Sequence, residues 1–588
     1  MTCERKESGR VDAVTVEIIG NLLLSIAEEM GFAIIRSAYS TNIKERRDIS
    51  TAVFDPDGNM VAQAEHVPMH LGSLLGIVAE VYKHFEPSQI RDGDMFIGND
   101  PYNGGGTHLP DITIVAPVFA GEKLIGWVAN LAHHSDVGGK VPGSTSGDAV
   151  SIFQEGTKIP LVRICEAGAL REDIVAIIMA NSRIPGERTG DLQAQVAANR
   201  VGMRRVVEAY RRYAETLLVS MRQLQDYAER KLRAGISKLP DGVYTFTDYM
   251  DDAGVNNPDP LRISVSIEIR GDRMVLDFNG TDKQVEGPIN VTYNGLAATV
   301  FYALKALIDP AVPSNAGIYR AFEVLCEPGL LVNAENPAPV GARIDTCQRV
   351  ADVIFGALAP AVPERVIACC NSSVTSAIFS AADPNDKDRF FVYLEVVAGG
   401  SGASKHADGL SGVQTHMTNT SNLPVEALES EFPLVTVRSY RLREDSGGGG
   451  RRRGGLGIVR EYEVLFDGIV YTGLGDRQKF APWGLEDGKE GLGGAYYLER
   501  ADGTSERLPS KCTDIPLRRG DVISVRTPGA GGYGDPLTRE AAAVLADVVE
   551  GKVSPTAARE IYGVAIASVA NGFEIDAVGT ENLRSGTA

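Results

Sequence analysis

The segment GGGTHLPDITIVAPVFAGEKLIGWVANLAHHSDVGG, residues 104–139, decides how this sequence is interpreted. Its two apolar runs, residues 112–119 and 124–132, flank the short connection Ala120-Gly121-Glu122-Lys123. Apolar runs of this length around a glycine-containing turn are typical of a β-hairpin. The segment therefore predicts two paired strands, and the rest of the chain is interpreted outward from them.

Polar side chains gather at the open end of this hairpin. They are His108, Asp111, His133, His134 and Asp136. A turn centred between Gly121 and Glu122 pairs residues whose numbers sum to 243, which places Asp111 opposite Ala132. Antiparallel neighbours lie about 5 Å apart, and imidazole and carboxylate are ligands that zinc, manganese and non-haem iron prefer. The pattern predicts a metal or catalytic site, and the alternative is a hydrogen-bonded polar cluster or salt-bridged surface histidines.

Successive residues of a strand point to opposite faces, so His133 and His134 cannot both reach one ion. One is expected to be a ligand, and the other to act in the outer shell or in proton transfer. Spacing does not fix a fourth ligand. Upstream candidates are Asp48, in KERRDIS, and His66 or His70, in AEHVPMHLGS. Pro68 separates these two histidines, which weakens them as a helical pair.

The length and charge of the chain limit its class. A chain of 588 residues is too long for one hydrophobic core, which predicts two to four domains. The net charge of -19 opposes broad contact with a phosphate backbone, so we expect no nucleic-acid partner. We also expect no membrane span, because the N-terminus is polar and no run of about 18 apolar residues occurs. Seven cysteines without a CxxC pair indicate reduced thiols and a cytoplasmic protein.

The periodicity along the chain predicts a mixed α and β (α+β), multi-domain fold with antiparallel strands and no repeating βαβ pattern. Helices are expected at residues 12–39, with Val14, Ile18, Leu22, Ile26, Met30 and Ala33 on one face, at 70–85, and at 193–238. Alternating strands begin after Pro240, and glycine-rich strands and loops follow residue 432. The expected domains are 1–238 with the metal site and long helix, 239–345 with a β-rich unit and following helices, and 346–588 with a glycine-rich mixed unit and C-terminal helices.

Other chemical signals in the sequence are weak. No GxxxxGK[ST] phosphate loop and no GxSxG nucleophile motif occurs. The run SGGGGRRRGGLG, residues 446–457, is interpreted either as an anion cradle or as a turn between strands. A polar stretch with His406, Asp408 and His416, near Asn419, Asn422 and Glu426, is a second candidate site without a supporting spacing rule.

Ordered motifs along nearly the whole chain resemble the hydantoinase B family. That family includes the C-terminal half of ATP-dependent 5-oxoprolinase and the B-type subunits of caprolactamase, acetone carboxylase and acetophenone carboxylase. The motifs are ERRDIS, VAQAEHVPMHLGS, GNDPYNGGGTHLPDITIVAPVF, AHHSDVGG, NSRIPGERTGDLQAQVAAN, DFNGTDKQVEGPIN, LPVEALESEFP, DSGGGGRRRGGLGIVREY and RTPGAGGYGDP. They are specific for the family and not for its substrate.

The resemblance implies a divalent metal, zinc or manganese, bound by Asp48, His108, Asp111 and His133. It leaves His134 and Asp136 as outer-shell or catalytic acid–base candidates. It also implies a hydantoinase A-type partner subunit that binds ATP and magnesium, in a hetero-oligomer such as (αβ)2. The missing phosphate loop agrees with ATP binding by the partner.

The expected function is that of the B-type subunit of an ATP-dependent hydrolase opening a cyclic amide: a hydantoin, 5-oxoproline or another lactam. Within the same family, the alternative is a subunit of an ATP-dependent ketone carboxylase. The alternative from another class is a non-catalytic scaffold subunit with a structural metal, which predicts a closed four-ligand site.

Overall fold

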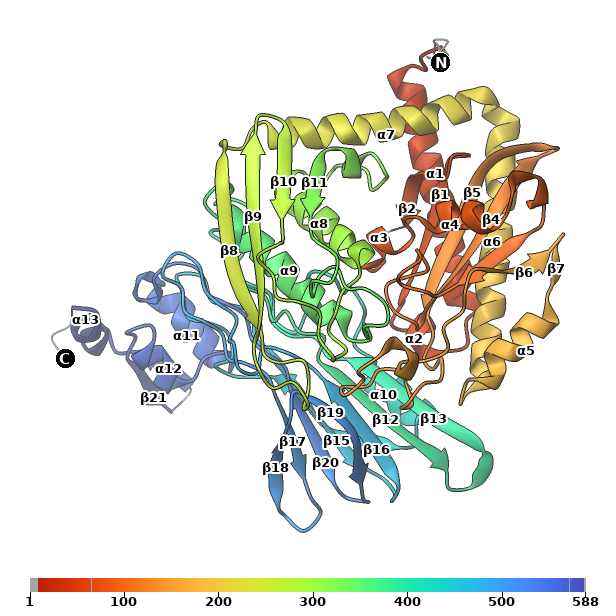
Figure 1. Cartoon of the computed structure of the whole chain (residues 1–588). Helices are drawn as coiled ribbons and strands as arrows, with labels where there is room; N and C mark the ends of the chain where they lie inside the picture. The colour runs from red at the N-terminus through yellow and green to blue at the C-terminus, as the bar shows by residue number, and fades with distance from the viewer. Residues whose placement is uncertain (1–8, 65, 571, 586–588) are drawn as a thin grey trace.

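The predicted hairpin lies at the centre of an antiparallel sheet (Figure 1). The structure is a computed structural model that describes residues 9–64, 66–570 and 572–585. The strand order in this sheet is β2-β1-β5-β4-β3-β6-β7. Its strands are β1 (Ile49–Phe54), β2 (Met60–Ala64), β3 (Met95–Gly98), β4 (Asp111–Ala120), β5 (Lys123–His133), β6 (Val162–Glu166) and β7 (Ala169–Leu170).

The register of the hairpin differs from the predicted one at its open end. Ala120 pairs with Lys123 at the turn, as predicted. The register then shifts, because Ile125 is an additional residue that has no partner on β4. This bulge moves every later pair by one residue. Asp111 therefore lies opposite His133, one residue further along β5 than predicted.

Helices cover both faces of this sheet. One face packs against α1 (Ala13–Ser37) and α6 (Pro185–Tyr213), and the other against α4 (Ile77–His84). The short helices α2 (Thr41–Lys44), α3 (His70–Ser73) and α5 (Glu172–Ala180) connect these elements. The helix predicted at residues 70–85 is interrupted at Gly76, which has φ +78° and separates α3 from α4.

The buried face of α1 is rotated from the predicted one. Ile26 and Met30 are buried as predicted, but Val14 and Ile18 are 67% and 51% exposed. Apolar residues surround most of this helix, so the sequence period does not define a single face. By length and composition α1 is also long and apolar enough to cross a membrane. In this fold it instead packs against α6, α7, β1 and β2.

The long helix predicted at 193–238 is two helices. α6 ends at Tyr213, Ala214 has φ +47°, and α7 (Glu215–Ile236) follows. A positive φ at a non-glycine residue breaks the helical geometry. Figure 1 shows α7 crossing from the first sheet to a second one, so this break lets a single segment connect the two layers.

The second layer is a sheet of order β11-β10-β9-β8 packed against two buried helices. These elements are β8 (Gly242–Met250), β9 (Leu261–Arg270), β10 (Arg273–Asp277), β11 (Phe322–Leu325), α8 (Tyr293–Ile308) and α9 (Arg343–Leu358). The predicted change to alternating strands after Pro240 is confirmed. The division into three domains stays a prediction, and its boundary at residue 345 falls inside α9.

The third layer consists of two sheets that share one apolar core (Figure 1). The sheet of order β13-β12-β16-β19 contains β12 (Ser376–Asp383), β13 (Asp386–Val396), β16 (Ile469–Leu474) and β19 (Lys511–Leu517). The sheet of order β14-β15-β20-β17-β18 contains β14 (Val435–Leu442), β15 (Ile458–Val464), β17 (Ala495–Glu499), β18 (Ser505–Leu508) and β20 (Val522–Arg526). The predicted mixed α and β, multi-domain class is confirmed.

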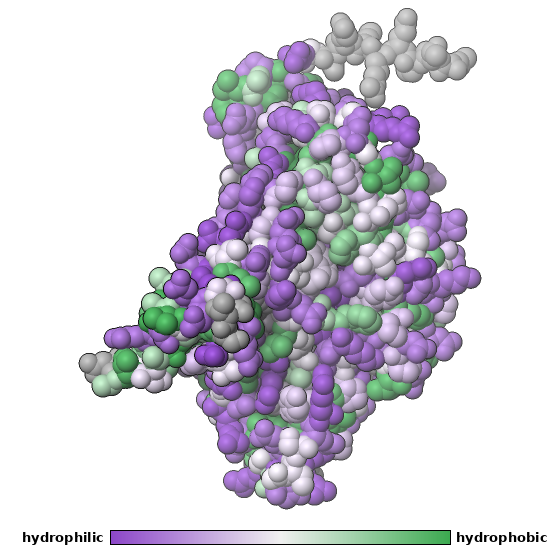
Figure 2. Space-filling view, turned by 90° about the vertical axis from the view of Figure 1, so that its left-hand side faces the viewer, coloured by the Kyte–Doolittle hydropathy of each residue, from purple (hydrophilic) through white to green (hydrophobic). Residues whose placement is uncertain are grey.

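The C-terminal part forms a small separate cluster beside these sheets. It contains α11 (Ala541–Val549), α12 (Pro555–Glu560), β21 (Ile566–Val569), β22 (Gly572–Ile575) and α13 (Ala577–Ser585). The remaining helix, α10 (Val425–Glu431), belongs to the third layer and precedes β14. Ser554 caps α12, because its hydroxyl accepts a hydrogen bond from the amide of Ala557 at 3.1 Å. Figure 2 shows a mostly hydrophilic face with small, separate apolar patches.

The glycine run at residues 446–457 is packed inside the fold as a turn. The amide of Gly448 donates to Ala530 O at 2.7 Å, and that of Gly455 donates to Ser401 O at 2.9 Å. A Cβ atom at Gly454 would lie 2.0 Å from Ala530 O. These two amides are used in backbone contacts and are not available to an anion, which favours the interpretation as a turn.

This packing gives a stability prediction. Gly454→Ala is expected to destabilise the protein by about 1–3 kcal/mol, because the added methyl overlaps the backbone of residue 530. The matched control is Gly186→Ala, where no atom lies within 4 Å of the added Cβ and the residue is helical. Thermal unfolding should show a lower midpoint for Gly454→Ala alone. Equal midpoints for the two variants would contradict the prediction.

Candidate metal and substrate site

Three neighbouring strands bring three of the predicted ligands to one end of the first sheet. Asp111 pairs with His133 across β4 and β5. On the other side of β5, the amide of His133 donates to Asp48 O at 3.1 Å. Asp48, His133 and Asp111 therefore lie in one row across β1, β5 and β4, which the one-residue bulge makes possible.

The glycine-rich loop before β4 adds His108 to this row. Gly106 has φ +88°, and a Cβ there would lie 2.7 Å from the Asp111 side chain, so only glycine fits this turn. His108 Nε2 lies 3.2 Å from Asp111 Oδ1, and the rings of His108 and His133 are 4.9 Å apart between centroids. Ligand atoms of His108, Asp111 and His133 all lie within 4.8 Å of one another.

Two buried atoms of this cluster, His108 Nε2 and Asp111 Oδ1, face each other with no hydrogen atom between them. His108 Nδ1 lies 3.2 Å from the carbonyl oxygen of Gly341, which can only accept a hydrogen bond. The proton of a neutral ring therefore sits on Nδ1, and Nε2 presents a lone pair to Asp111 Oδ1. Among the described residues, neither His108 Nε2 nor Asp111 Oδ1 has a hydrogen-bond partner. Two facing acceptors fit a cation between them.

The electrostatics of the cluster favour the protonation states in which its side chains could bind a metal ion. Burial, together with the nearby Arg343 charge, lowers the pKa of His108 to about 3, so its ring is neutral. Burial would raise the pKa of Asp111, but His108 and Arg343 outweigh it and hold that pKa well below the usual range. Burial also lowers the pKa of His133. Neutral imidazoles and ionised carboxylates are the ligand forms that zinc and manganese require.

Surrounding residues fix the orientation of these side chains. Arg343 Nη2 donates to Asp111 Oδ2 at 2.8 Å, which leaves Oδ1 toward the cluster. Glu155 accepts the amide of Gly341 at 2.7 Å and so holds the carbonyl that meets His108. The amide nitrogen of Asn42 lies 3.0 Å from His133 Nδ1. Outer contacts of this kind preset ligand geometry in metal sites.

His70 also reaches this cluster, although its spacing in the sequence made it a weak candidate. Its Nε2 lies 3.8 Å from Asp48 Oδ1 and 3.9 Å from Asp111 Oδ1. Ser50 Oγ holds the other ring nitrogen at 3.1 Å. His66 instead packs against Gly31 of α1. The two histidines separate because Pro68 precedes the start of α3 at His70, so only His70 turns back toward β1.

His134 points to the opposite face of β5 from His133, as strand alternation predicts. Its ring contacts Gln195 Oε1 at 2.9 Å and Arg188 Nε at 3.2 Å, both on α6. Asp136 lies in the following loop, where it accepts from Arg183 Nη1 at 2.9 Å and from the amide of Gly138 at 3.1 Å. Neither side chain lines the cavity at the cluster.

A narrow cavity of about 60 Å³ opens beside the cluster. Asp48, His108 and His133 line it. The remaining lining combines two arginines, one further carboxyl, several hydroxyls, one glycine and apolar side chains: Arg46, Arg343, Asp345, Thr145, Ser376, Thr418, Thr420, Gly341, Val67, Ala342, Ile344, Val374, Ile378, Leu394, Val396 and Leu474. The site can therefore hold a small molecule with both polar and apolar edges.

The second candidate site does not come together. His416 is buried, with Nε2 3.1 Å from Asp352 and Nδ1 3.2 Å from the Tyr302 hydroxyl. His406 is at the surface and pairs with Glu364 at 3.2 Å. Asp408 accepts from Arg539 at 2.7 Å, elsewhere in the fold.

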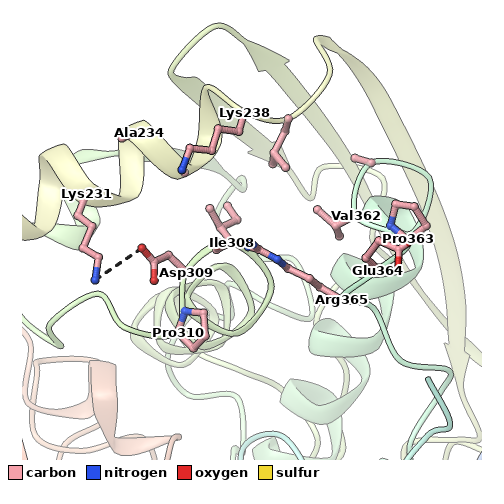
Figure 3. A pocket seen from close by; sticks show the side chains of 13 residues that line it. Lys231, Ala234, Lys238, Ile308, Asp309, Pro310, Val362, Pro363, Glu364 and Arg365 are labelled. Carbon is pink, nitrogen blue, oxygen red and sulfur yellow. Dashed lines mark hydrogen bonds and ion pairs between the residues drawn. The ribbon is translucent and has the colours of Figure 1, made fainter. Parts of the chain in front are cut away.

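A larger surface pocket of about 650 Å³ lies between α7, α8 and the loop after α9 (Figure 3). Its lining contains positively and negatively charged side chains. Lys231 lies 3.6 Å from Asp309, and Arg365 donates hydrogen bonds to the last carbonyl oxygens of α8. The residues that line it include no histidine or cysteine. The titratable cluster beside the smaller cavity is therefore the stronger site for chemistry.

Residues 12–536 match the family model described as Hydantoinase B/oxoprolinase, and the chain belongs to this family. A putative B-type subunit of a D-/L-hydantoinase from Pseudomonas sp. (strain NS671) is 33% identical over 98% of this chain and 98% of its own length. The resemblance inferred from the sequence motifs is thus confirmed. The name of this Pseudomonas relative gives it as one subunit of that enzyme.

Solved structures show the same fold. The crystal structure of ATP-dependent caprolactamase from Pseudomonas jessenii is 31% identical, with a TM-score of 0.90 over 98% of this chain and all of that chain. Acetone carboxylase in its nucleotide-free structure has a TM-score of 0.90 over 98% of this chain and 83% of that chain. At 19% identity, that second match shows the fold alone.

The facing acceptors give a prediction about metal binding. His108→Ala is expected to lower metal affinity at least 100-fold, because it removes one of the two atoms that face each other. The control His406→Ala changes an exposed histidine that pairs only with Glu364. Elemental analysis after dialysis against zinc or manganese measures the bound ion per chain. Full metal content in His108→Ala would contradict the assignment.

Proposed function

We propose that this chain is the B-type subunit of an ATP-dependent hydrolase that opens a cyclic amide such as a hydantoin, 5-oxoproline or another lactam. Asp48, His108, Asp111 and His133 would hold its zinc or manganese ion. The observation that carries the proposal is the buried pair of facing acceptors, His108 Nε2 and Asp111 Oδ1, in a chain of this family. A divalent ion bound there would polarise a carbonyl group and activate water.

The proposed partner is a hydantoinase A-type subunit that binds ATP and magnesium, in a hetero-oligomer such as (αβ)2 in the cytoplasm. The sequence supports ATP binding by the partner, because it contains no GxxxxGK[ST] phosphate-binding motif. The Pseudomonas relative is named as one subunit of a hydantoinase, which supports a second subunit here. Unstrained amides resist hydrolysis, and coupling to ATP supplies the driving force that a metal site lacks.

Asp345 is the residue we assign to proton transfer at this site. It lies in the first turn of α9 and lines the cavity beside the cluster. Its Oδ1 accepts the amide of Val374 at 2.7 Å, which fixes the carboxyl in place. Burial and the nearby Asp476 charge raise the pKa of Asp345 to about 7. A carboxyl with this pKa holds a proton near neutral pH and can donate it to the leaving amide nitrogen.

The reaction class is tested with the reconstituted pair of subunits. ATP hydrolysis is expected to rise when hydantoin, 5-oxoproline or caprolactam is added, with ring-opened product in equal amount. Acetone with bicarbonate is the control that represents the ketone carboxylase alternative. Stimulation by acetone alone would replace the hydrolase proposal, and stimulation by none of these compounds would favour the scaffold alternative.

A variant of Asp345 tests the assigned proton donor. Asp345→Asn is expected to lower kcat about 100-fold with unchanged metal content, because the amide cannot donate an acidic proton. In the unaltered enzyme the rate should fall as pH rises through about 7, where Asp345 loses its proton, and the variant should lack this limb. Asp173→Asn, at an exposed aspartate, is the control. An unchanged pH profile in Asp345→Asn would overturn the assignment.

A further inference from the structure

Arg46 is a buried cation that lines the narrow cavity beside the metal-ligand cluster, which we call the metal cavity. It lies just after α2, in the ERRD segment that ends with the expected ligand Asp48. Only 2% of its surface is exposed, and it lines the cavity together with His108 and His133. Arg46 therefore lies next to any molecule that occupies this cavity.

The hydrogen bonds of Arg46 go only to neutral groups. Its Nη1 donates to Asn42 Oδ1 at 2.6 Å and to Leu394 O at 3.3 Å. Its Nε is buried without a hydrogen-bond partner. Among the described residues, no carboxylate oxygen lies within 4.0 Å of its guanidinium nitrogens.

Several other buried arginines have an acidic partner, whereas Arg188 contacts His134 Nδ1 and the carbonyl oxygen of Asp136. Arg343 contacts Asp111 at 2.8 Å, Arg460 contacts Glu395 at 2.9 Å, and Arg477 contacts Asp352 at 2.7 Å. A buried charge without a counter-charge costs several kcal/mol, and proteins rarely keep one without a use. The environment of Arg46 thus differs from that of Arg343, Arg460 and Arg477 in lacking an anion.

The charges of the residues around the cavity also favour a bound anion. A bound divalent ion would add two positive charges beside Arg46 and Arg343, which both line the cavity. Asp345, with Asp476, Lys511 and Ser373 around it, retains a proton for part of the time at neutral pH. A loaded site is therefore positive and attracts a negatively charged ligand.

A second polar atom among the residues that line this cavity also lacks a partner. The hydroxyl of Thr420 lines the cavity and is buried without a hydrogen bond to any described residue. A guanidinium and a hydroxyl together suit an oxygen-rich group, because guanidinium nitrogens bind two oxygens of one oxyanion.

We propose that Arg46 binds an oxyanion, a carboxylate or phosphoryl group, on the molecule that occupies the metal cavity. This inference rests on the proposed function only for the identity of that molecule. A cyclic amide bearing an acid group would supply a carboxylate, and an intermediate activated with ATP would supply a phosphoryl group. A neutral, unactivated lactam would leave Arg46 without a counter-charge.

The competing explanation is that Arg46 only positions His133 through Asn42. Asn42 accepts from Arg46 and places its amide nitrogen against the ring and the carbonyl oxygen of His133, at 3.0 and 2.8 Å. Asn42→Ala breaks this chain of contacts and leaves the guanidinium in the protein. It is therefore the matched variant that separates positioning from anion binding.

The experiment is isothermal titration of the full-length, zinc-loaded chain with inorganic phosphate and, separately, with acetate. Arg46→Met is expected to weaken binding of at least one anion about 10- to 100-fold at unchanged zinc content. Arg46→Lys should retain part of the affinity because it keeps the charge, and it also serves if Arg46→Met fails to fold. Asn42→Ala should keep clearly more of the anion affinity than Arg46→Met does, because it leaves the guanidinium in the protein.

The two anions distinguish the two sources of the oxyanion. Tighter binding of phosphate assigns a phosphoryl group, and tighter binding of acetate assigns a carboxylate. Equal anion affinity in the unaltered chain and Arg46→Met would overturn the inference, as would an equal loss in Asn42→Ala and Arg46→Met. These outcomes need no turnover, so anion binding through Arg46 can hold even if no cyclic amide stimulates ATP hydrolysis.

Discussion

The pairing of Asp111 with His133 is the constraint on which the rest of the site depends. It exists because Ile125 adds one residue to β5, which shifts the end of the hairpin by one position. A one-residue shift changes the face to which every side chain points. With it, His133 faces Asp111 and Asp48, and His134 faces Gln195 on α6. Without it, these two histidines would exchange their environments.

Because this pair of residues is buried, the site favours a bound cation. His108 and Asp111 are almost fully buried, and their facing atoms are both acceptors. Water cannot relieve this contact cheaply in a closed interior, whereas a cation can. Arg343 holds the far oxygen of Asp111, and Gly341 holds the far nitrogen of His108. The fold therefore maintains two ligand atoms at a fixed separation with their lone pairs directed inward.

Sequence patterns predicted the elements near the site better than their exact geometry. The hairpin and the cluster of polar residues at one strand end both follow from periodicity and turn residues. The bulge at Ile125 does not follow from them. It lies next to Gly126, where a Cβ would lie 2.6 Å from Phe54 O of β1. The break at Ala214 was likewise hidden, because its neighbours are good helix formers.

Residues distant in sequence were the least predictable part of the site. Arg46 belongs to the first layer, and Arg343 and Asp345 both lie on α9, so they meet only when α9 packs beside the first sheet. No local spacing connects them to His108. The most direct test of the metal site is a crystal structure of the zinc-loaded chain with anomalous scattering measured at the zinc edge. We expect one peak between His108 Nε2 and Asp111 Oδ1, and a zinc-loaded crystal with no peak at that position would contradict the assignment.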